Sequence, residues 1–254
     1  MMPLSVMILA GGQSRRMGQD KALLPGRDGQ PLLCQTVRTA LQLAPRVVIV
    51  TPWPERYRTL LDDVRSRYNP ALSPSAVQLV QEPLPNASGP LGGFFQGWEV
   101  LTSSWCLLLA CDLPYLEASV LQDWWQQLAG QSDPRTVASL VPGIGRRGKQ
   151  FSAASGGERS PAALKGQEPP AVIKGWEPTT VMKGWEPTTV IKGWEPLCGF
   201  YHRRGLLGLK RYLAGGGRSF QGWLADVPVT PYYGVPNKML FNCNTPQDWE
   251  SVQF

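Results

Sequence analysis

Residues 9–21 read Leu9-Ala10-Gly11-Gly12-Gln13-Ser14-Arg15-Arg16-Met17-Gly18-Gln19-Asp20-Lys21. The segment follows an apolar run, residues 4–9, whose composition is typical of a buried parallel strand. Its glycines allow a sharp turn that exposes backbone N–H groups, and Arg15, Arg16 and Lys21 bring cations to the same turn. Amides and fixed cations together bind polyphosphates. The segment therefore predicts a phosphate-binding loop after a strand; the alternative is a solvated glycine-rich turn with arginines of no function.

Strand-like and helix-like segments alternate along most of the chain. We expect strands at 4–9, 46–51, 77–80, 105–111 and 136–141, and helices at 31–44, 54–64 and 116–129, with a further helix after the glycine-rich turn 88–93. Beyond residue 195 we expect a strand at 196–201, helices at 204–214 and through 223–224, edge strands at 227–233 and 239–241, and a last helix begun by Thr245 and Pro246. This order predicts an α/β fold with a Rossmann-like, mostly parallel open sheet and helices on both faces.

The alternation stops at residues 143–195. There Lys-Gly-Trp-Glu-Pro recurs every nine residues from Lys174, Lys183 and Lys192, and Lys165 begins the same motif with Gln in place of Trp. The unit is too short for a solenoid repeat, and its Gly and Pro interrupt helix and strand alike. We expect one domain over 1–254 with 143–195 as a low-complexity, flexible surface insertion. The alternative is a Trp-bearing segment that binds a partner protein.

Composition and charge exclude several classes of protein. No apolar run approaches the ~18 residues of a membrane span, and the N-terminus lacks the basic segment of a signal peptide. The five cysteines contain no C-x-x-C pair, which is typical of free thiols in a reducing compartment, so we expect a cytoplasmic protein. A net charge of +6 over 254 residues suits a nucleotide and an anionic second substrate, and we expect no nucleic-acid and no membrane partner.

Three polar features follow predicted strands where those strands end. They are the loop after residue 9, Glu82 and Asp112. In open α/β sheets, ligands bind beyond the carboxyl ends of the strands, so these features are expected to converge. Asp112 beside a polyphosphate is suited to hold Mg²⁺, which takes few protein carboxylates and completes its shell with phosphate and water. The alternative role for Asp112 is to cap the next helix.

The 13 residues of the loop resemble the L-A-G-G-x-S-x-R-M-G-x-D-K signature of molybdenum cofactor guanylyltransferases, the MobA-like branch of the GT-A-like nucleotidyltransferases. Four further motifs of that family occur in the family's order outside 143–195. They are G-P-L-x-G from Gly89, C-D-L-P from Cys111, G-x-R-S from Gly216 and N-x-N-T-P-x-D from Asn242.

The resemblance implies roles for individual residues. The nucleotide would contact Leu9, Ala10, Gly11, Gly12, Lys21, Glu82 and Asp112, with Lys21 on its phosphates and Mg²⁺ on Asp112. Glu82 departs from the aspartate that the family often carries there, which keeps the charge and changes the reach. Asn242 and Asn244 align with asparagines on the pterin side of the cleft, and Arg218 would meet the pterin phosphate. Lys21, Asp112, Arg15 and Arg16 are the expected catalytic residues.

The implied reaction is transfer of GMP from GTP to the phosphate of molybdopterin, releasing pyrophosphate. That nucleophile is ionised at pH 7, so no general base is needed, in agreement with a chain that has one histidine, His202. The implied partners are GTP and molybdopterin or molybdenum cofactor and, transiently, cofactor-synthesis or acceptor enzymes. The alternatives are a cytidylyltransferase or sugar-phosphate nucleotidyltransferase of the same fold, and a non-enzymatic binding module.

Overall fold

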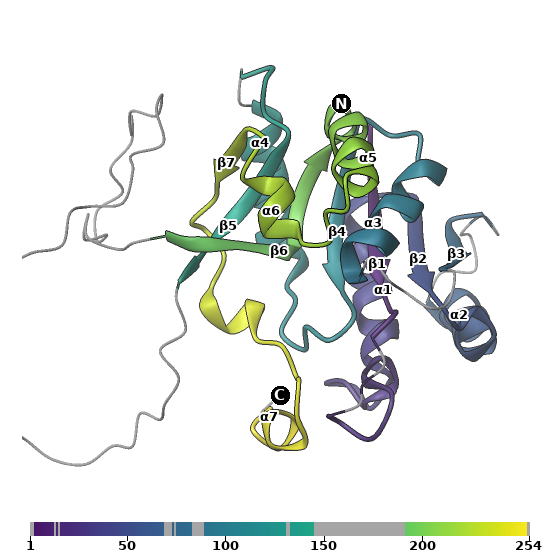
Figure 1. The fold of residues 1–254 in the computed structure, drawn as a ribbon. Helices are drawn as coiled ribbons and strands as arrows, with labels where there is room; N and C mark the ends of the chain where they lie inside the picture. The colour runs from purple at the N-terminus through teal and green to yellow at the C-terminus, as the bar shows by residue number, and fades with distance from the viewer. Residues whose placement is uncertain are drawn as a thin grey trace, which may run out of the picture.

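A seven-stranded sheet forms the centre of the molecule in the computed structural model, which describes residues 3–12, 14, 16–68, 73, 75–82, 89–130, 133–144 and 191–252. The strands are β1 (Leu4–Leu9), β2 (Val47–Thr51), β3 (Val77–Gln81), β4 (Trp105–Ala110), β5 (Ala138–Ile144), β6 (Ile191–His202) and β7 (Val229–Pro231). Their order in the sheet is β3-β2-β1-β4-β6-β5-β7. Among them only β6 runs antiparallel to its neighbours, which confirms the predicted mostly parallel α/β sheet (Figure 1).

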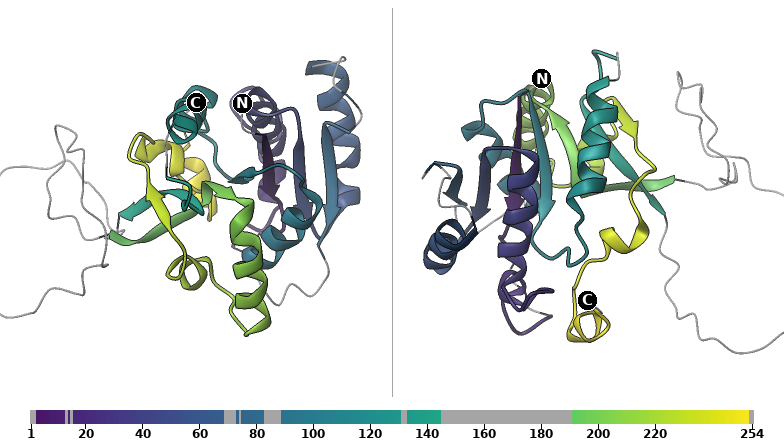
Figure 2. Two further views of the ribbon diagram at one scale, coloured as in Figure 1. Left: turned by 90° about the horizontal axis from the view of Figure 1, so that it is seen from above. Right: turned by 180° about the vertical axis from the view of Figure 1, so that it is seen from behind.

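Helices cover both faces of the sheet. They are α1 (Leu32–Leu43), α2 (Pro54–Tyr68), α3 (Gly89–Val100), α4 (Ala118–Gly130), α5 (Leu206–Ala214), α6 (Phe220–Leu224) and α7 (Pro246–Glu250), with short 3₁₀ turns at Lys21–Leu23, Arg203–Gly205 and Asn237–Leu240. Helices α1, α2 and α4 pack on one face, and α3, α5 and α6 pack on the other (Figure 2). Helix α7 stands apart from both layers, below the sheet in Figure 1.

The central strands are apolar on both sides because both faces of the sheet are covered. In β1, Val6 and Ile8 belong to the core under α1, α2 and α4, whereas Met7 between them belongs to the core under α3, α5 and α6. All six residues of β4 are buried. This two-sided burial explains why the strands read as continuous apolar runs rather than as alternating ones.

Two expectations about the C-terminal third are wrong. Residues 239–241, expected as an edge strand, lie in and just after the 3₁₀ turn Asn237–Leu240, where Pro236 precedes the turn and Met239 is buried. The strand expected at 196–201 begins earlier, at Ile191, because β5 and β6 pair from Ala138↔Tyr201 to Ile144↔Ile191. The two ends of the expected insertion 143–195 are therefore sheet, and its remainder, 145–190, lies outside the described residues.

The expectations about the cysteines and the start of the last helix agree with the structure. All five cysteines are free, and Cys34, Cys106, Cys198 and Cys243 are buried. Thr245 is the N-cap of α7 and Pro246 its first residue, as expected. Among the described residues, no helix combines the length and the apolar character that a membrane span requires.

Candidate active site

A cleft of about 490 Å³ opens at the carboxyl ends of β1 and β4. The two strands pair in register from Leu4↔Trp105 to Leu9↔Ala110, so the loop after β1 and the turn after β4 leave the sheet side by side. The cleft is lined by Leu9, Ala10, Gly11, Gly12, Ser14, Arg16, Asp20, Lys21, Ala22, Glu82, Gly89, Pro90, Gly93, Ala110, Cys111, Asp112, Leu197 and Asn244. Strand order thus brings the three predicted strand-end features together, as expected for this architecture.

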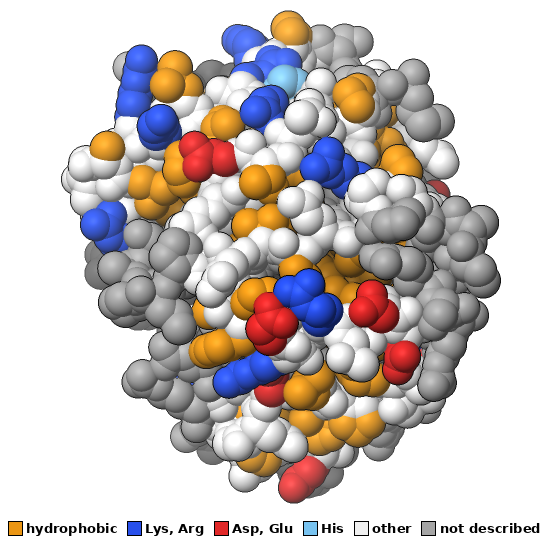
Figure 3. Space-filling view, turned by 90° about the vertical axis from the view of Figure 1, so that its right-hand side faces the viewer, with side chains coloured by type: hydrophobic (Ala, Val, Ile, Leu, Met, Phe, Trp, Pro, Cys, Tyr) orange, Lys and Arg blue, Asp and Glu red, His pale blue; other side chains and the backbone are white. Residues whose placement is uncertain are grey.

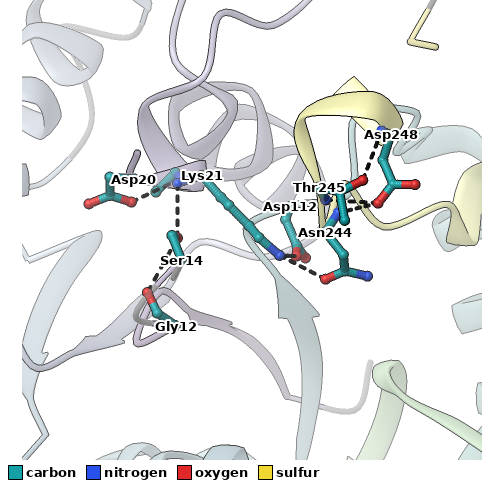
Figure 4. Close-up of polar contacts among 9 residues, drawn as sticks. Gly12, Ser14, Asp20, Lys21, Asp112, Asn244, Thr245 and Asp248 are labelled. Carbon is teal, nitrogen blue, oxygen red and sulfur yellow. Dashed lines mark hydrogen bonds and ion pairs between the residues drawn. The ribbon is translucent and has the colours of Figure 1, made fainter. Parts of the chain in front are cut away.

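The side chain of Lys21 lines this cleft, and its ammonium group lies between two oxygen acceptors. Its Nζ lies 3.2 Å from Asp112 Oδ2 and donates a hydrogen bond of 2.7 Å to Asn244 Oδ1 (Figure 4). The side chains of Lys21 and Asp112 are 17% and 16% exposed, so the ion pair is screened only partly by water. Lys21, Asp112 and Asn244 come from three separate segments of the chain, and the contact joins them.

The backbone around Lys21 is held by side chains of the same loop. The N–H of Lys21 donates to Ser14 Oγ at 3.2 Å, and Ser14 adopts a positive φ of 45°, which is rare for a residue with a side chain. Asp20 caps the 3₁₀ turn by accepting from the N–H of Ala22 at 3.1 Å, and its other oxygen accepts from Tyr57 Oη at 2.7 Å. Burial, followed by that contact with Asp20, raises the pKa of Tyr57, so the phenol remains a donor.

Glu82 occupies a different environment in the same cleft. Its side chain is buried, with 5% of the residue exposed, and its Oε1 has no hydrogen-bond partner among the described residues. A Cβ added at Gly11 would stand 2.7 Å from Glu82 Oε2, and one added at Gly93 would stand 3.0 Å from Oε1. The carboxyl therefore fits between two glycines that any side chain would crowd. Burial raises the pKa of Glu82 to about 7.

The acidic groups present fit one kind of divalent cation. Among the described residues, no group of three or more His, Cys, Asp or Glu is arranged to bind a metal. Asp112 stands at the cleft with Lys21, and α4 begins only at Ala118, so the alternative role of capping the next helix is wrong. A site with so few carboxylates suits a hard cation that keeps most of its shell for phosphate and water.

The sequence-predicted residues divide into three groups. Leu9, Ala10, Gly11, Gly12, Arg16, Lys21, Glu82, Asp112 and Asn244 line the cleft. Asn242 and Arg218 do not line it: Asn242 Oδ1 is buried without a partner among the described residues, and Arg218 donates to the carbonyls of Leu213 and Gly217. Arg15 lies outside the described residues. The structure shows which of these residues line the cleft, and the roles of all three groups stay predictions.

Sequence reasoning missed two groups that hold the site. Ser14 and Asp20 fix the backbone of Lys21. Both belong to residues 9–21, and Ser and Asp in a turn are residue types whose side chains accept hydrogen bonds from nearby backbone N–H groups. Asp248 fixes the residues before α7. The spacing Thr245-x-x-Asp248, which is that of a capping box, could have predicted this role from the sequence.

The MobA-like NTP transferase domain model matches residues 6–227, from β1 to the segment before β7. The chain belongs to the MobA-like NTP transferase family. Two curated relatives have sequences similar over nearly all of its length. A protein of Nostoc sp. named "Probable molybdenum cofactor guanylyltransferase" is 38% identical, covering 98% of this chain and 90% of its own. A protein of the same name from Synechococcus elongatus is 35% identical, covering 99% of each chain.

Solved structures share the fold of this MobA-like chain. Molybdopterin-guanine dinucleotide biosynthesis protein A from Archaeoglobus fulgidus matches with a TM-score of 0.57 and 18% identity, covering 97% of this chain and 95% of that one. The 4-diphosphocytidyl-2C-methyl-D-erythritol synthase of Anaerococcus prevotii matches with a TM-score of 0.58 and 11% identity, covering 97% and 92%. Because these identities are low, the likeness concerns the fold and leaves the base of the nucleotide to be argued from the cleft itself.

Proposed function

We propose that this MobA-like chain transfers GMP from GTP to the terminal phosphate of molybdopterin, forming a guanine dinucleotide cofactor and pyrophosphate. An oxygen of the pterin phosphate attacks the α-phosphorus of GTP, and the bond to the β-phosphate oxygen breaks. The names of the full-length relatives support this reaction. The observation that carries it is the contact of Lys21 with Asp112 in a cleft that Glu82 also lines.

The chain's own groups act in this reaction by orientation and by neutralising charge. The loop after β1 would contact the phosphates through its backbone amides, and Lys21 and Arg16 would offset the charge that develops on the phosphate oxygens. No general base is required, because the attacking phosphate is already ionised. His202 is unsuited to catalysis here, since it pairs with Trp105 at the start of β4, the edge of the sheet opposite the cleft.

Asp112 would hold Mg²⁺, the cation that fits a site of few carboxylates. When bound, Mg²⁺ neutralises charge on the phosphates of the nucleotide. Lys21 then carries a second function, because in the free protein its ammonium balances Asp112. The ion pair keeps both groups in the cleft in the absence of nucleotide.

Glu82 favours guanine over the other bases. A carboxylate presents two acceptors side by side, and guanine is the common base whose pairing edge presents two adjacent donors, N1–H and N2–H. Cytosine, adenine and uracil each place an acceptor next to their donor. A bidentate pair of this kind discriminates by about 1–3 kcal/mol against the wrong base. The buried Oε1, unpaired among the described residues, is thus suited to receive such a donor.

Charge and thiols agree with the proposed substrates and compartment. In the lower half of Figure 3, acidic and basic side chains lie next to one another rather than forming a continuous basic surface. The proposal of small anionic substrates rather than nucleic acid is supported by the modest net charge of +6 over 254 residues. The five free cysteines suit a reducing compartment, the cytoplasm, where cofactor-synthesis and acceptor enzymes would be transient partners.

The test is incubation of the purified chain with molybdopterin, Mg²⁺ and GTP, CTP or UTP in turn, followed by chromatography of the dinucleotide product and measurement of pyrophosphate. The expected result is a guanine dinucleotide formed at least tenfold faster than a cytosine dinucleotide, the ratio set by about 1.4 kcal/mol. Preferential formation of a cytosine dinucleotide would replace this proposal with the cytidylyl alternative. If GTP binds and no dinucleotide forms, the proposed enzymatic activity is contradicted.

A further inference from the structure

The N-terminus of α7 is fixed by a reciprocal set of hydrogen bonds. Thr245 Oγ1 accepts from the N–H of Asp248 at 3.1 Å, and Asp248 Oδ2 accepts from the N–H groups of Thr245 at 2.8 Å and of Asn244 at 2.9 Å (Figure 4). Burial pushes the pKa of Asp248 upward, but these backbone donors and the Thr245 hydroxyl outweigh it and hold that pKa below its ordinary value. Asp248 is therefore ionised where it accepts, which strengthens the bonds.

The same set of bonds fixes the residue that contacts Lys21. Asn244 directly precedes the N-cap, its N–H is bound by Asp248, and its Oδ1 accepts from Lys21 Nζ at 2.7 Å. The contact spans 223 residues of sequence. One carboxylate thus restrains the backbone of Asn244, and the side chain of Asn244 then restrains the ammonium group in the cleft.

A second set of contacts ties the same segment to the loop of Lys21. Met17 and Leu24, which flank Lys21 in sequence, form a small apolar cluster with Leu32 and Cys243, against which Trp249 and Val252 pack. The N–H of Cys243 also donates to the carbonyl of Asp112 at 3.3 Å. The C-terminal segment therefore contacts both partners of the Lys21–Asp112 pair, whereas α7 itself has no buried residue.

We propose that Asp248 is a positioning residue for Lys21: it fixes Asn244 so that the amide oxygen holds the lysine ammonium in the cleft beside Asp112. Asn244 accordingly serves the nucleotide side of the cleft, in addition to the pterin side that its motif implies. The consequence for turnover rests on the proposed function, but the geometry of Lys21 in the free protein does not.

The first experiment measures the amine of Lys21 without any substrate. Trace acetylation of the folded chain, quantified by mass spectrometry, gives the reactivity of Lys21 relative to the exposed Lys210 on α5. Asn244→Ala should raise this ratio about fivefold, the equivalent of one lost hydrogen bond at 1.4 kcal/mol per tenfold. Asp248→Ala should raise it similarly, and Asp248→Asn, which keeps an oxygen acceptor, should restore most of the parent value.

A double variant separates positioning from a general loss of structure. If Asp248 acts through Asn244, Asn244→Ala with Asp248→Ala should label Lys21 no faster than Asn244→Ala alone. Asp133→Ala is the matched control: its carboxylate accepts from the backbone N–H of Arg135 before β5, at the sheet edge opposite the cleft, and it should leave the ratio unchanged. Additive effects, an unchanged ratio in Asp248→Ala, or an equal rise in Asp133→Ala would each overturn the proposal.

Steady-state kinetics then extend the test to the reaction. Asp248→Ala should lower kcat for the guanylyl transfer about fivefold, with a smaller change in the KM for GTP, and Asp248→Asn should regain most of the parent kcat. If Asp248→Ala fails to fold, two other variants decide by their labelling ratios. Asn244→Ala should raise the ratio, and Thr245→Ser, which keeps the capping hydroxyl, should match the parent. If the variants label Lys21 faster as expected but the parent chain transfers no GMP, the positioning role of Asp248 is retained and the proposed function is refuted.

Discussion

Two carboxyl groups that line the cleft have opposite surroundings. Asp112 follows β4 and Glu82 follows β3, and these strands lie on opposite sides of β1 in the sheet, so we call the part of the cleft around Asp112 the charged end and the part around Glu82 the dry end. At one end Asp112 has Lys21 as a cationic partner at 3.2 Å, and Lys21 in turn has Asn244. At the other end Glu82 is surrounded by the glycines at 11 and 93, has an unpaired Oε1 among the described residues, and has a pKa raised to about 7 by burial. The difference teaches that one cleft can contain one carboxyl group with a balancing cation and another whose Oε1 has no partner among the described residues.

The largest expected effect comes from breaking the charged end. Lys21→Ala and Asp112→Ala should each lower kcat for guanylyl transfer by about 100- to 1,000-fold, because each removes a fixed charge that stabilises the transferring phosphate or its cation. Circular dichroism should show an unchanged fold. Lys210→Ala, an exposed lysine on α5, is the matched control. Near-parental turnover in either cleft variant would remove that residue from the proposed mechanism.

The next largest effect comes from changing the dry end. Glu82→Gln replaces two acceptors with one acceptor and one donor, and the new donor opposes a donor of guanine. The affinity for GTP, measured by calorimetry with Mg²⁺, should fall by about 10- to 100-fold, while UTP, which offers a donor beside an acceptor, should bind better than to the parent chain. Equal loss of GTP and UTP binding would show that Glu82 does not contact the base.

The raised pKa of Glu82 makes folding stability depend on pH. The neutral carboxyl is favoured in the folded chain, so its stabilising contribution is present below the ordinary value of 4.5 and is lost as pH rises through about 7. Relative to Glu82→Gln, the parent should have an equal free energy of unfolding at pH 4 and one lower by roughly 3 kcal/mol at pH 8. Urea titrations across this range measure the difference. If the free energies of unfolding of the parent and of Glu82→Gln change with pH in the same way, the Glu82 carboxyl is solvated.

The smallest effect should come from changing Gly93, one of the two glycines beside the Glu82 carboxyl. Gly93→Ala places a Cβ 3.0 Å from Glu82 Oε1, and the carboxyl end can move aside. The free energy of unfolding should change by less than about 1 kcal/mol, because alanine also favours the helix. The preference for GTP over CTP should nevertheless fall a few-fold, since the displaced carboxyl no longer meets both donors. Gly208→Ala on α5, where a Cβ meets nothing within 4 Å, is the control.

The sequence predicted the first half of the fold and the cleft well because local signals there agree with one another. The runs at β1, β2 and β4 are almost entirely apolar. The loop of Lys21, Glu82 and Asp112 follow the carboxyl ends of β1, β3 and β4, so the rule for open parallel sheets was enough to bring them together. The state of Glu82 could not be predicted in the same way. Its pKa depends on burial against Gly11 and Gly93, which are 71 and 11 residues away in sequence.

The C-terminal third was harder to predict because its structure depends on partners distant in sequence. Residues 239–241 have a strand-like composition, yet they pair with none of the seven strands that the structure describes. Instead, the 3₁₀ turn Asn237–Leu240 follows Pro236. The start of β6 lies in a Lys-Gly-Trp-Glu-Pro unit, and pairing with β5 overrides the Gly and Pro in it. The role of Asn244 at Lys21 is likewise a tertiary contact that spacing alone does not reveal.

The pairing of β5 with β6 also fixes where the chain leaves and re-enters the sheet on either side of residues 145–190. Strand β5 runs parallel to β1 and β4, so it ends at Ile144 toward the same edge where the cleft opens, and β6 starts there at Ile191. Leu197, six residues further along β6, lines the cleft, which puts roughly 20 Å of strand between that attachment point and the cleft wall. Both Ile144 and Ile191, between which the repeats are inserted in the sequence, thus lie on the side of the molecule where the cleft opens.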